Sequence, residues 1–91
     1  MNEAPKLTAQ VDRGNVIIVF RLHGGAEALR LYCRRGSGAD FERLTDDPVS
    51  PFIDSRPNLA PGPEPRDYRA CYVTSGGEET LCSMPVSVVV D

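Results

Sequence analysis

Three cysteines and one histidine are the side chains of this sequence that could support nucleophilic catalysis. A cysteine nucleophile needs a neighbouring imidazole to take its proton. His23 lies ten positions before Cys33, and an extended segment of that length spans ~33 Å. We therefore predict no catalytic residue and no enzymatic activity, and we expect His23 to be a solvated loop residue.

The same residues do not have the spacing of a structural metal site. There is no Cys-x-x-Cys pair and only one histidine, whereas structural zinc sites use closely spaced cysteine and histidine ligands. We expect no metal ion and no cofactor. The odd number of cysteines favours small, reduced thiols. It slightly favours a cytoplasmic location, but the sequence does not determine the compartment.

Cys71 and Cys82 form the most informative pair. The two residues are placed symmetrically about Gly76 and Gly77, and adjacent glycines suit the tight turn of a β-hairpin. A hairpin centred on these glycines would place the two cysteines directly across from each other, where a disulfide could form and add up to ~3 kcal/mol. Two reduced thiols are the alternative, which we narrowly prefer because Cys33 would remain unpaired.

Composition limits the classes of partner. The 91 residues carry a net charge of −3 and suit a single domain spanning 1–91. Without an excess of basic residues we expect no nucleic-acid binding. We expect no membrane association, since no stretch approaches the ~20 apolar residues of a spanning helix. The start of the chain lacks a signal-peptide pattern. A protein partner of unknown identity and a monomeric state are favoured.

Alternation of apolar and polar residues predicts β-strands throughout. We expect no helix, a loop at 45–50, and a rigid, proline-rich connection at 57–65. The fold class predicted is an all-β, seven-stranded antiparallel sandwich. Its strands are expected at 6–11, 16–22, 28–35, a short segment anchored by Phe41 and Leu44, 51–54, 67–74 and 80–90.

Several motifs resemble the fibronectin type III domain, an immunoglobulin-like sandwich. They are Ile18-Val19-Phe20 in the second strand, Leu29 to Arg35 in the third, and Leu59-Ala60-Pro61-Gly62 followed by Tyr68 to Val73. The chain is also similar to sandwich domains of uncharacterised bacterial proteins.

The resemblance implies roles for several of these residues. Tyr68 would be a tyrosine corner whose hydroxyl bonds backbone near Leu59. Ile18, Phe20 and Leu31 would lie in the core, with Phe20 where the family has a tryptophan. The sequence departs from the family pattern by a longer gap before Tyr68.

The resemblance also places the third, sixth and seventh strands in one sheet and so defines a candidate interaction face. Its outward residues would be Arg30, Tyr32, Arg34, Arg69, Cys71 and Val73. An arginine stacked on Tyr32 is expected there, and tyrosine and arginine are enriched at binding hot spots. The alternative is a solvated face whose arginines meet carboxylates such as Glu42 or Glu79.

The function predicted is a non-enzymatic protein-interaction module that uses this face or the loops at one end. A passive structural spacer or assembly domain in a longer protein is the first alternative. The second is a weak carbohydrate-binding accessory domain, in which exposed aromatic rings would stack on a sugar. The rings available for this are Tyr32, Phe41, Phe52 and Tyr72.

Overall fold

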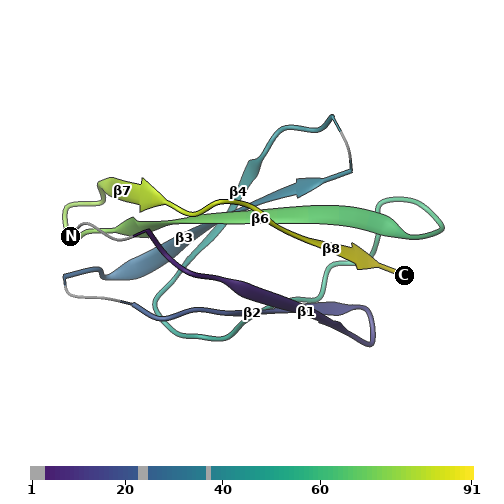
Figure 1. The fold of residues 1–91 in the computed structure, drawn as a ribbon, viewed down its shortest axis with the longest axis horizontal. Helices are drawn as coiled ribbons and strands as arrows, with labels where there is room; N and C mark the ends of the chain where they lie inside the picture. Colours follow the sequence, from purple (N-terminus) through teal and green to yellow (C-terminus); the bar gives the residue numbers. More distant parts are fainter. Residues whose placement is uncertain (1–3, 23–24, 37) are drawn as a thin grey trace.

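The protein is folded as two antiparallel β-sheets packed face to face, with the longest strand, β6, running the length of one layer (Figure 1). The structure is a computed structural model that describes residues 4–22, 25–36 and 38–91. One sheet has the order β1-β2-β5, and the other has the order β4-β3-β6-β7 with β8 also paired to β6. The strands are β1 (Thr8–Asp12), β2 (Asn15–Val19), β3 (Ala28–Arg35), β4 (Glu42–Asp47), β5 (Phe52–Asp54), β6 (Glu64–Val73), β7 (Glu79–Cys82) and β8 (Val86–Val90).

The core forms because side chains alternate between the two faces of each strand. On β3 the odd-numbered residues from Leu29 to Cys33 are buried, while the residues between them are half-buried. Ile18 of β2, Leu31 of β3 and Ala70 of β6 belong to one apolar cluster between the sheets, and Phe20 joins them at the end of β2. The predicted all-β sandwich is confirmed.

The number of strands is one higher than predicted, because the last strand is split in two. Both β7 and β8 pair with β6, and Pro85 lies between them. Proline has no backbone N–H to give to a sheet ladder. Ser83 instead bonds to Ala70 in both directions: its N–H donates to the Ala70 carbonyl at 2.7 Å, and its hydroxyl accepts the Ala70 N–H at 3.0 Å.

The loop predicted at 45–50 is wrong in its first half. Strand β4 continues to Asp47, with Asp46 opposite Arg30 and Asp47 opposite Leu29. Aspartate disfavours strands as an isolated residue, but Asp46 is held here by the guanidinium group of Arg30. Likewise β6 begins at Glu64, inside the segment 57–65 that was expected to be a rigid connection between strands. In each case long-range ion pairs outweigh local preference.

The hairpin turn between β6 and β7 has a three-residue loop, 75–77. The N–H of Thr74 donates to the Glu78 carbonyl at 3.0 Å and that of Gly77 donates to the Thr74 carbonyl at 2.9 Å. Gly77 has φ +81°, which is the left-handed conformation that closes such loops. Within residues 4–22, 25–36 and 38–91, no helix has the length and apolar character needed to cross a membrane.

Truncating the core should cost much more stability than truncating the surface. Leu31 is 1% exposed and Leu81 is 50% exposed. We expect Leu31→Ala to lower the free energy of unfolding by ~2–5 kcal/mol, and Leu81→Ala to lower it by less than ~1 kcal/mol. Urea denaturation of both variants measures this difference. Equal losses would contradict the placement of Leu31 between the sheets.

Candidate functional site

A charged cluster is buried at one end of the sandwich, behind the face predicted for interaction. We call Asp54, Glu64, Arg66 and Tyr68 the buried ion cluster. Tyr68, Ala70 and Tyr72 face inward on β6, and the same two-residue period turns Glu64 and Arg66 inward as well. Arg66 is 1% exposed and Asp54 is 2% exposed. Since Asp54 is on β5 and Arg66 is on β6, their ion pair joins the two sheets.

The guanidinium group of Arg66 is fully engaged in hydrogen bonds. Its Nε donates to Glu64 Oε2 at 2.6 Å, and its Nη1 to Asp54 Oδ2 at 3.2 Å. Its Nη2 donates to the Arg56 carbonyl at 3.0 Å and to Asn58 Oδ1 at 3.1 Å. A buried charge is tolerated only when it is paired and its donors are satisfied, and Arg66 meets both conditions.

Tyr68 does not make the tyrosine corner expected from the resemblance. Its hydroxyl donates to Asp54 Oδ2 at 2.6 Å, not to backbone near Leu59. The N–H of Leu59 donates instead to Glu64 Oε1 at 2.9 Å. The longer segment before Tyr68 explains the change, because it supplies Glu64 and Arg66, which bind the backbone of the crossover in place of the tyrosine.

Both carboxyl groups of the buried ion cluster are held in the charged form. Burial opposes ionisation of Asp54, but hydrogen bonds from Arg56 and Tyr68 outweigh it and lower its pKa to about 2. Burial likewise opposes ionisation of Glu64, and bonds from the Leu59 N–H, Arg66 and Arg35 lower its pKa to about 2. Burial, with the nearby Asp54 carboxylate, raises the pKa of Tyr68. At neutral pH the two carboxyl groups are thus ionised and the Tyr68 hydroxyl is neutral.

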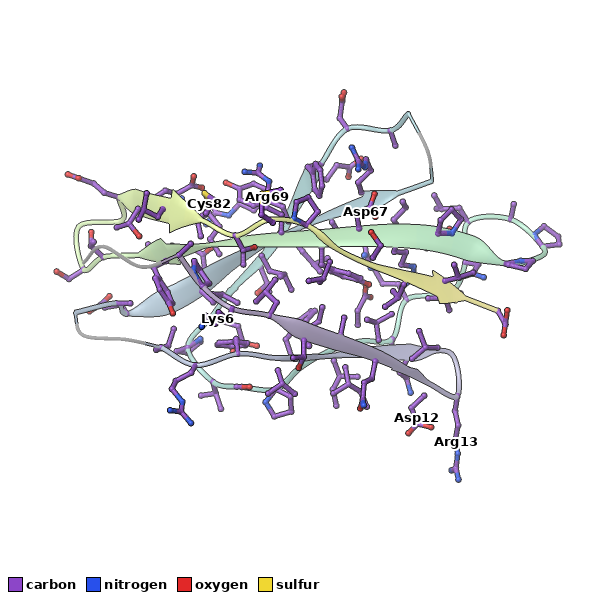
Figure 2. The ribbon with its side chains drawn as sticks, in the orientation of Figure 1. Lys6, Asp12, Arg13, Asp67, Arg69 and Cys82 are labelled. Atoms are coloured by element: carbon purple, nitrogen blue, oxygen red, sulfur yellow. A yellow bond between two sulfur atoms is a disulfide. The ribbon has the colours of Figure 1, made fainter. Side chains whose placement is uncertain are left out.

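Strand β6 turns the side chains between these residues outward, onto the predicted interaction face. Asp67 and Arg69 lie on the side of β6 that faces away from β1 and β2 (Figure 2). The register pairs Arg69 with Tyr32, and Asp67 with Arg34. Sequence reasoning had placed Tyr32, Arg34 and Arg69 on one face, and the structure brings them together.

Alternating arginine and aromatic side chains form a continuous row across this face. The Arg69 guanidinium lies 4.8 Å from the centre of the Tyr32 ring and 5.2 Å from that of Phe41. The Arg34 guanidinium lies 4.6 Å from the Phe41 ring centre. We call Arg34, Phe41, Arg69 and Tyr32 the arginine–aromatic row. Phe41 was predicted as an anchor of a short strand and as one of the rings that could stack on a sugar. It was not placed in this row, because its position beside Arg34 and Arg69 depends on the path of the preceding loop.

Carboxylates pair with Arg34, at one end of the row, and with Arg30, which lies two residues before Tyr32 on β3 at the other end. Arg30 binds Asp46 through two bonds of 2.9 and 3.0 Å and reaches Glu79 at 3.3 Å, while Arg34 binds Asp67 at 2.7 Å. The alternative of a carboxylate-paired face was therefore right about Glu79, but the remaining partners are aspartates and not Glu42.

The contacts of Glu79 also shift the pKa values of Glu79 and Tyr32. The Tyr32 hydroxyl donates to Glu79, and this bond, followed by that from Arg30, lowers the pKa of Glu79. The same bond raises the pKa of Tyr32. The side chain of Glu79 is therefore held in the charged form at a fixed place beside the row.

Val73 and Cys71 do not belong to the exposed face as predicted. Val73 is 5% exposed and Cys71 is fully buried, because β7 pairs with β6 at these positions, with Cys82 opposite Cys71 and Glu79 opposite Val73. Cys71 and Cys82 are joined in a disulfide, so the preference for two reduced thiols was wrong. A neighbouring edge strand thus covers what alternation alone would leave exposed.

The remaining cysteine lies inside the sandwich. Cys33 is a free thiol that is 3% exposed, and burial raises its pKa, which disfavours the nucleophilic thiolate. His23 lies outside the described residues. Sequence reasoning missed the buried ion cluster, although one signal was present: Glu64 and Arg66 share the strand period of Tyr68.

Two antiparallel sheets packed face to face, one with the order β1-β2-β5 and the other with the order β4-β3-β6-β7, define an immunoglobulin-like β-sandwich. Among solved structures, the chain is similar to a Fn3-like protein from Clostridium thermocellum, with a TM-score of 0.72 and 21% identity over 91% of this chain and 86% of that chain. The chain therefore has a fibronectin type III-like fold, and the predicted resemblance is confirmed for the fold. No family model and no curated protein matches the sequence.

The buried ion cluster predicts a loss of stability in acid. The ordinary pKa values of Asp54 and Glu64, 3.8 and 4.5, are lowered to about 2 in the fold, so the unfolded chain binds protons first. The stability that they supply is present above pH ~5 and is lost as the pH falls toward 2, by up to ~2 kcal/mol for Asp54 alone. Urea denaturation between pH 7 and pH 2.5 measures this.

Two variants separate the cluster from the other carboxylates. Asp54→Asn should lower stability at neutral pH and flatten the pH profile. Asp12→Asn, at an exposed position on β1 of the same sheet, should leave the profile of the parent chain. An unchanged profile for Asp54→Asn would contradict the role given to this carboxylate.

Proposed function

We propose that this chain is a non-enzymatic protein-interaction module that binds its partner with the exterior of the β4-β3-β6-β7 sheet. The observation that carries the proposal is the arginine–aromatic row, in which two guanidinium groups and two rings are stacked across two strands and a loop. Arginine and tyrosine are among the residues that contribute most to protein interfaces. Val73 has no part in this surface, since it is buried.

The row is organised before a partner arrives. Each arginine that stacks on a ring, or binds a carboxylate, has already lost much of its side-chain freedom, so less conformational entropy is lost on binding. Arg34 is the anchored member of the row, with an ion pair to Asp67, and the neighbouring Arg30 is anchored by Asp46. A rigid surface of this kind favours a partner with a matching, preformed shape.

The charge of Arg69 suggests the chemistry of the partner. Within the described part of the chain no carboxylate lies within ion-pair distance of Arg69, whereas Arg30 has two such partners and Arg34 has one. A carboxylate from a partner could bind the edge of this guanidinium while its face stays on Tyr32 and Phe41. We therefore infer an acidic segment in the partner, placed over the centre of the row.

A structural spacer is the second candidate function, and the shape of the domain supports it. The molecule extends 41 Å along its longest axis. The Ala4–Thr8 segment lines the same groove as Cys82–Met84, beside β7, while β8 ends at the opposite end of the long axis (Figure 1). A domain entered at one end and left at the other could separate two neighbours in a longer chain.

Loss of one guanidinium should weaken partner binding. A partner would first be captured on the immobilised chain, identified by mass spectrometry, purified and titrated by calorimetry. We expect Arg69→Ala to raise the dissociation constant by about 30-fold, the effect of a ~2 kcal/mol hot spot. The matched control is Arg13→Ala, an exposed cation in the β1–β2 turn on the other sheet (Figure 2), which should leave binding unchanged. Equal affinity of Arg69→Ala and the parent chain would rule out the row as the binding surface.

A further inference from the structure

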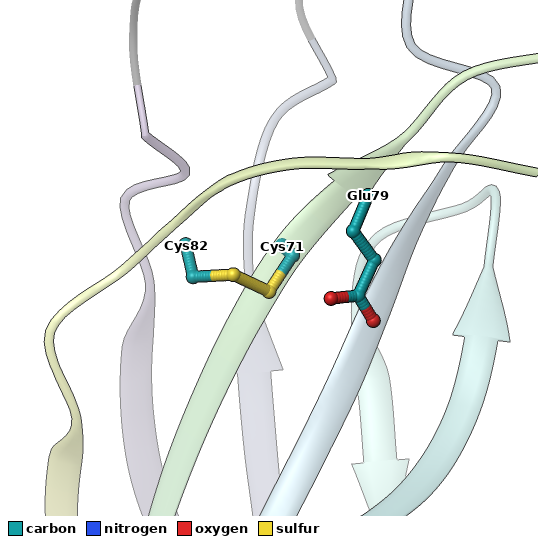
Figure 3. Close-up of side chains that lie close together, drawn as sticks. All are labelled: Cys71, Glu79 and Cys82. Atoms are coloured by element: carbon teal, nitrogen blue, oxygen red, sulfur yellow. A yellow bond between two sulfur atoms is a disulfide. The ribbon is translucent and has the colours of Figure 1, made fainter.

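Three potential metal ligands meet where β6 and β7 pair. The sulfur atoms of Cys71 and Cys82 and a carboxylate oxygen of Glu79 all lie within 4.8 Å of one another. Figure 3 shows the Glu79 carboxylate pointing toward the two sulfurs on the same side of the sheet. In the structure the cysteines form a disulfide, which has no thiolate to offer. The same three groups would form a different site after reduction.

We propose that the reduced chain binds one zinc ion through Cys71 Sγ, Cys82 Sγ and a carboxylate oxygen of Glu79, with water at the fourth position. Thiolate and carboxylate ligands suit zinc, and three protein ligands with one open position form a common coordination set. The proposal does not rest on the proposed partner-binding function, although Glu79 also accepts a hydrogen bond from Tyr32 of the row.

The chemistry has two balanced steps. A small thiol reductant first transfers two electrons to the disulfide: two R–SH molecules become one R–S–S–R, and the chain gains two cysteine thiols. Zinc then binds the two sulfurs, and the two thiol protons leave to solvent. The disulfide R–S–S–R reverses the sequence: it takes two electrons from the zinc-bound thiolates and two protons from solvent, and it becomes two R–SH while the Cys71–Cys82 bond re-forms and the ion is released. The site would therefore hold metal only in the reduced state.

The strand pairing holds the ligands close after the S–S bond breaks. Cys71 and Cys82 are opposite each other in the β6–β7 register, and their Cα atoms are 4.1 Å apart. A tetrahedral zinc ion with Zn–S bonds of ~2.3 Å separates its sulfurs by roughly 3.7 Å. Rotation of the two cysteine side chains can reach this separation without moving the backbone, so the fold supplies a preformed pair of thiolates.

Two neighbouring side chains orient the Glu79 carboxylate, and they would therefore fix its position as a ligand of a bound ion. Its Oε2 atom accepts bonds from Arg30 Nη1 and from the Tyr32 hydroxyl, as the outer groups around a metal often orient its ligands. Two thiolates and one carboxylate leave a net charge of −1 on a zinc site, and Arg30, opposite Cys71 on β3, offsets it. The side chain of Glu79 is 34% exposed, so an ion can enter from solvent.

The test measures zinc binding to the chain in both redox states. The purified protein is reduced with a phosphine, freed of reductant without oxygen, and titrated with Zn²⁺ against a chromophoric chelator. We expect one ion per reduced chain and none per oxidised chain. Co²⁺ in place of Zn²⁺ should give the visible bands of a tetrahedral thiolate site. Absence of stoichiometric binding to the reduced chain would refute the proposal.

Matched variants assign the ligands. Cys71→Ser should abolish binding, and Glu79→Gln should weaken it by at least about tenfold, the lower limit found even for groups that only orient ligands. Cys33→Ser and Glu78→Gln are the controls, one a thiol inside the sandwich and one an exposed neighbour, and both should bind as the parent chain does. Loss of binding in Cys33→Ser, or full binding in Cys71→Ser, would contradict the site.

Folding of the reduced chain is followed by circular dichroism during the titration. A β-sheet spectrum before and after addition of Zn²⁺, or one that appears only with Zn²⁺, agrees with a site formed by paired strands. A reduced chain that stays unfolded at saturating Zn²⁺ would overturn the proposal, since its ligands would then have no strand register to hold them.

Discussion

The burial of one guanidinium group, that of Arg66, constrains how this sandwich closes. A charged side chain taken out of water is strongly destabilising unless its partners are all in place. Arg66 finds those partners on β5, on β6 and in the crossover between them. The two sheets can therefore adopt few alternative arrangements at this end, because any shift would leave a buried charge unpaired.

The burial of Arg66 also determines which side chains of β6 face the exterior, because successive residues of a strand point to opposite faces. A slip of one residue in β6 would carry Arg66 to solvent and Arg69 toward the core. The interactions that fix Arg66 inward also fix Arg69 opposite Tyr32, and so maintain the arginine–aromatic row. The buried ion cluster and the proposed binding surface are two faces of one strand, which links the stability of the fold to its proposed function.

The fold could be predicted from sequence because β2 is a run of strand-forming residues and because side chains alternate between inward and outward positions in β3 and in the middle of β6. The third strand, 28–35, was predicted with the bounds that the structure shows. The split last strand, the extension of β4 and the burial of Val73 could not be predicted, since each depends on a neighbouring strand. The buried ion cluster was missed because Glu64 lies between two prolines, and the proline-rich composition favoured a rigid connection there over the start of a strand.

The sequence predicted which arginine and tyrosine residues lie on the candidate face, but it did not predict all of the side chains that they contact. Alternation places Tyr32, Arg34 and Arg69 outward, but only the packed structure brings Phe41 between the two guanidinium groups. The central claim is that Arg66 is held in the charged form inside the sandwich, and nuclear magnetic resonance of its side-chain Nε–H tests this most directly. We expect that proton to exchange with solvent far more slowly than that of the exposed Arg13. Equally rapid exchange at the two arginines would show that Arg66 is open to water, and would contradict this account of the fold.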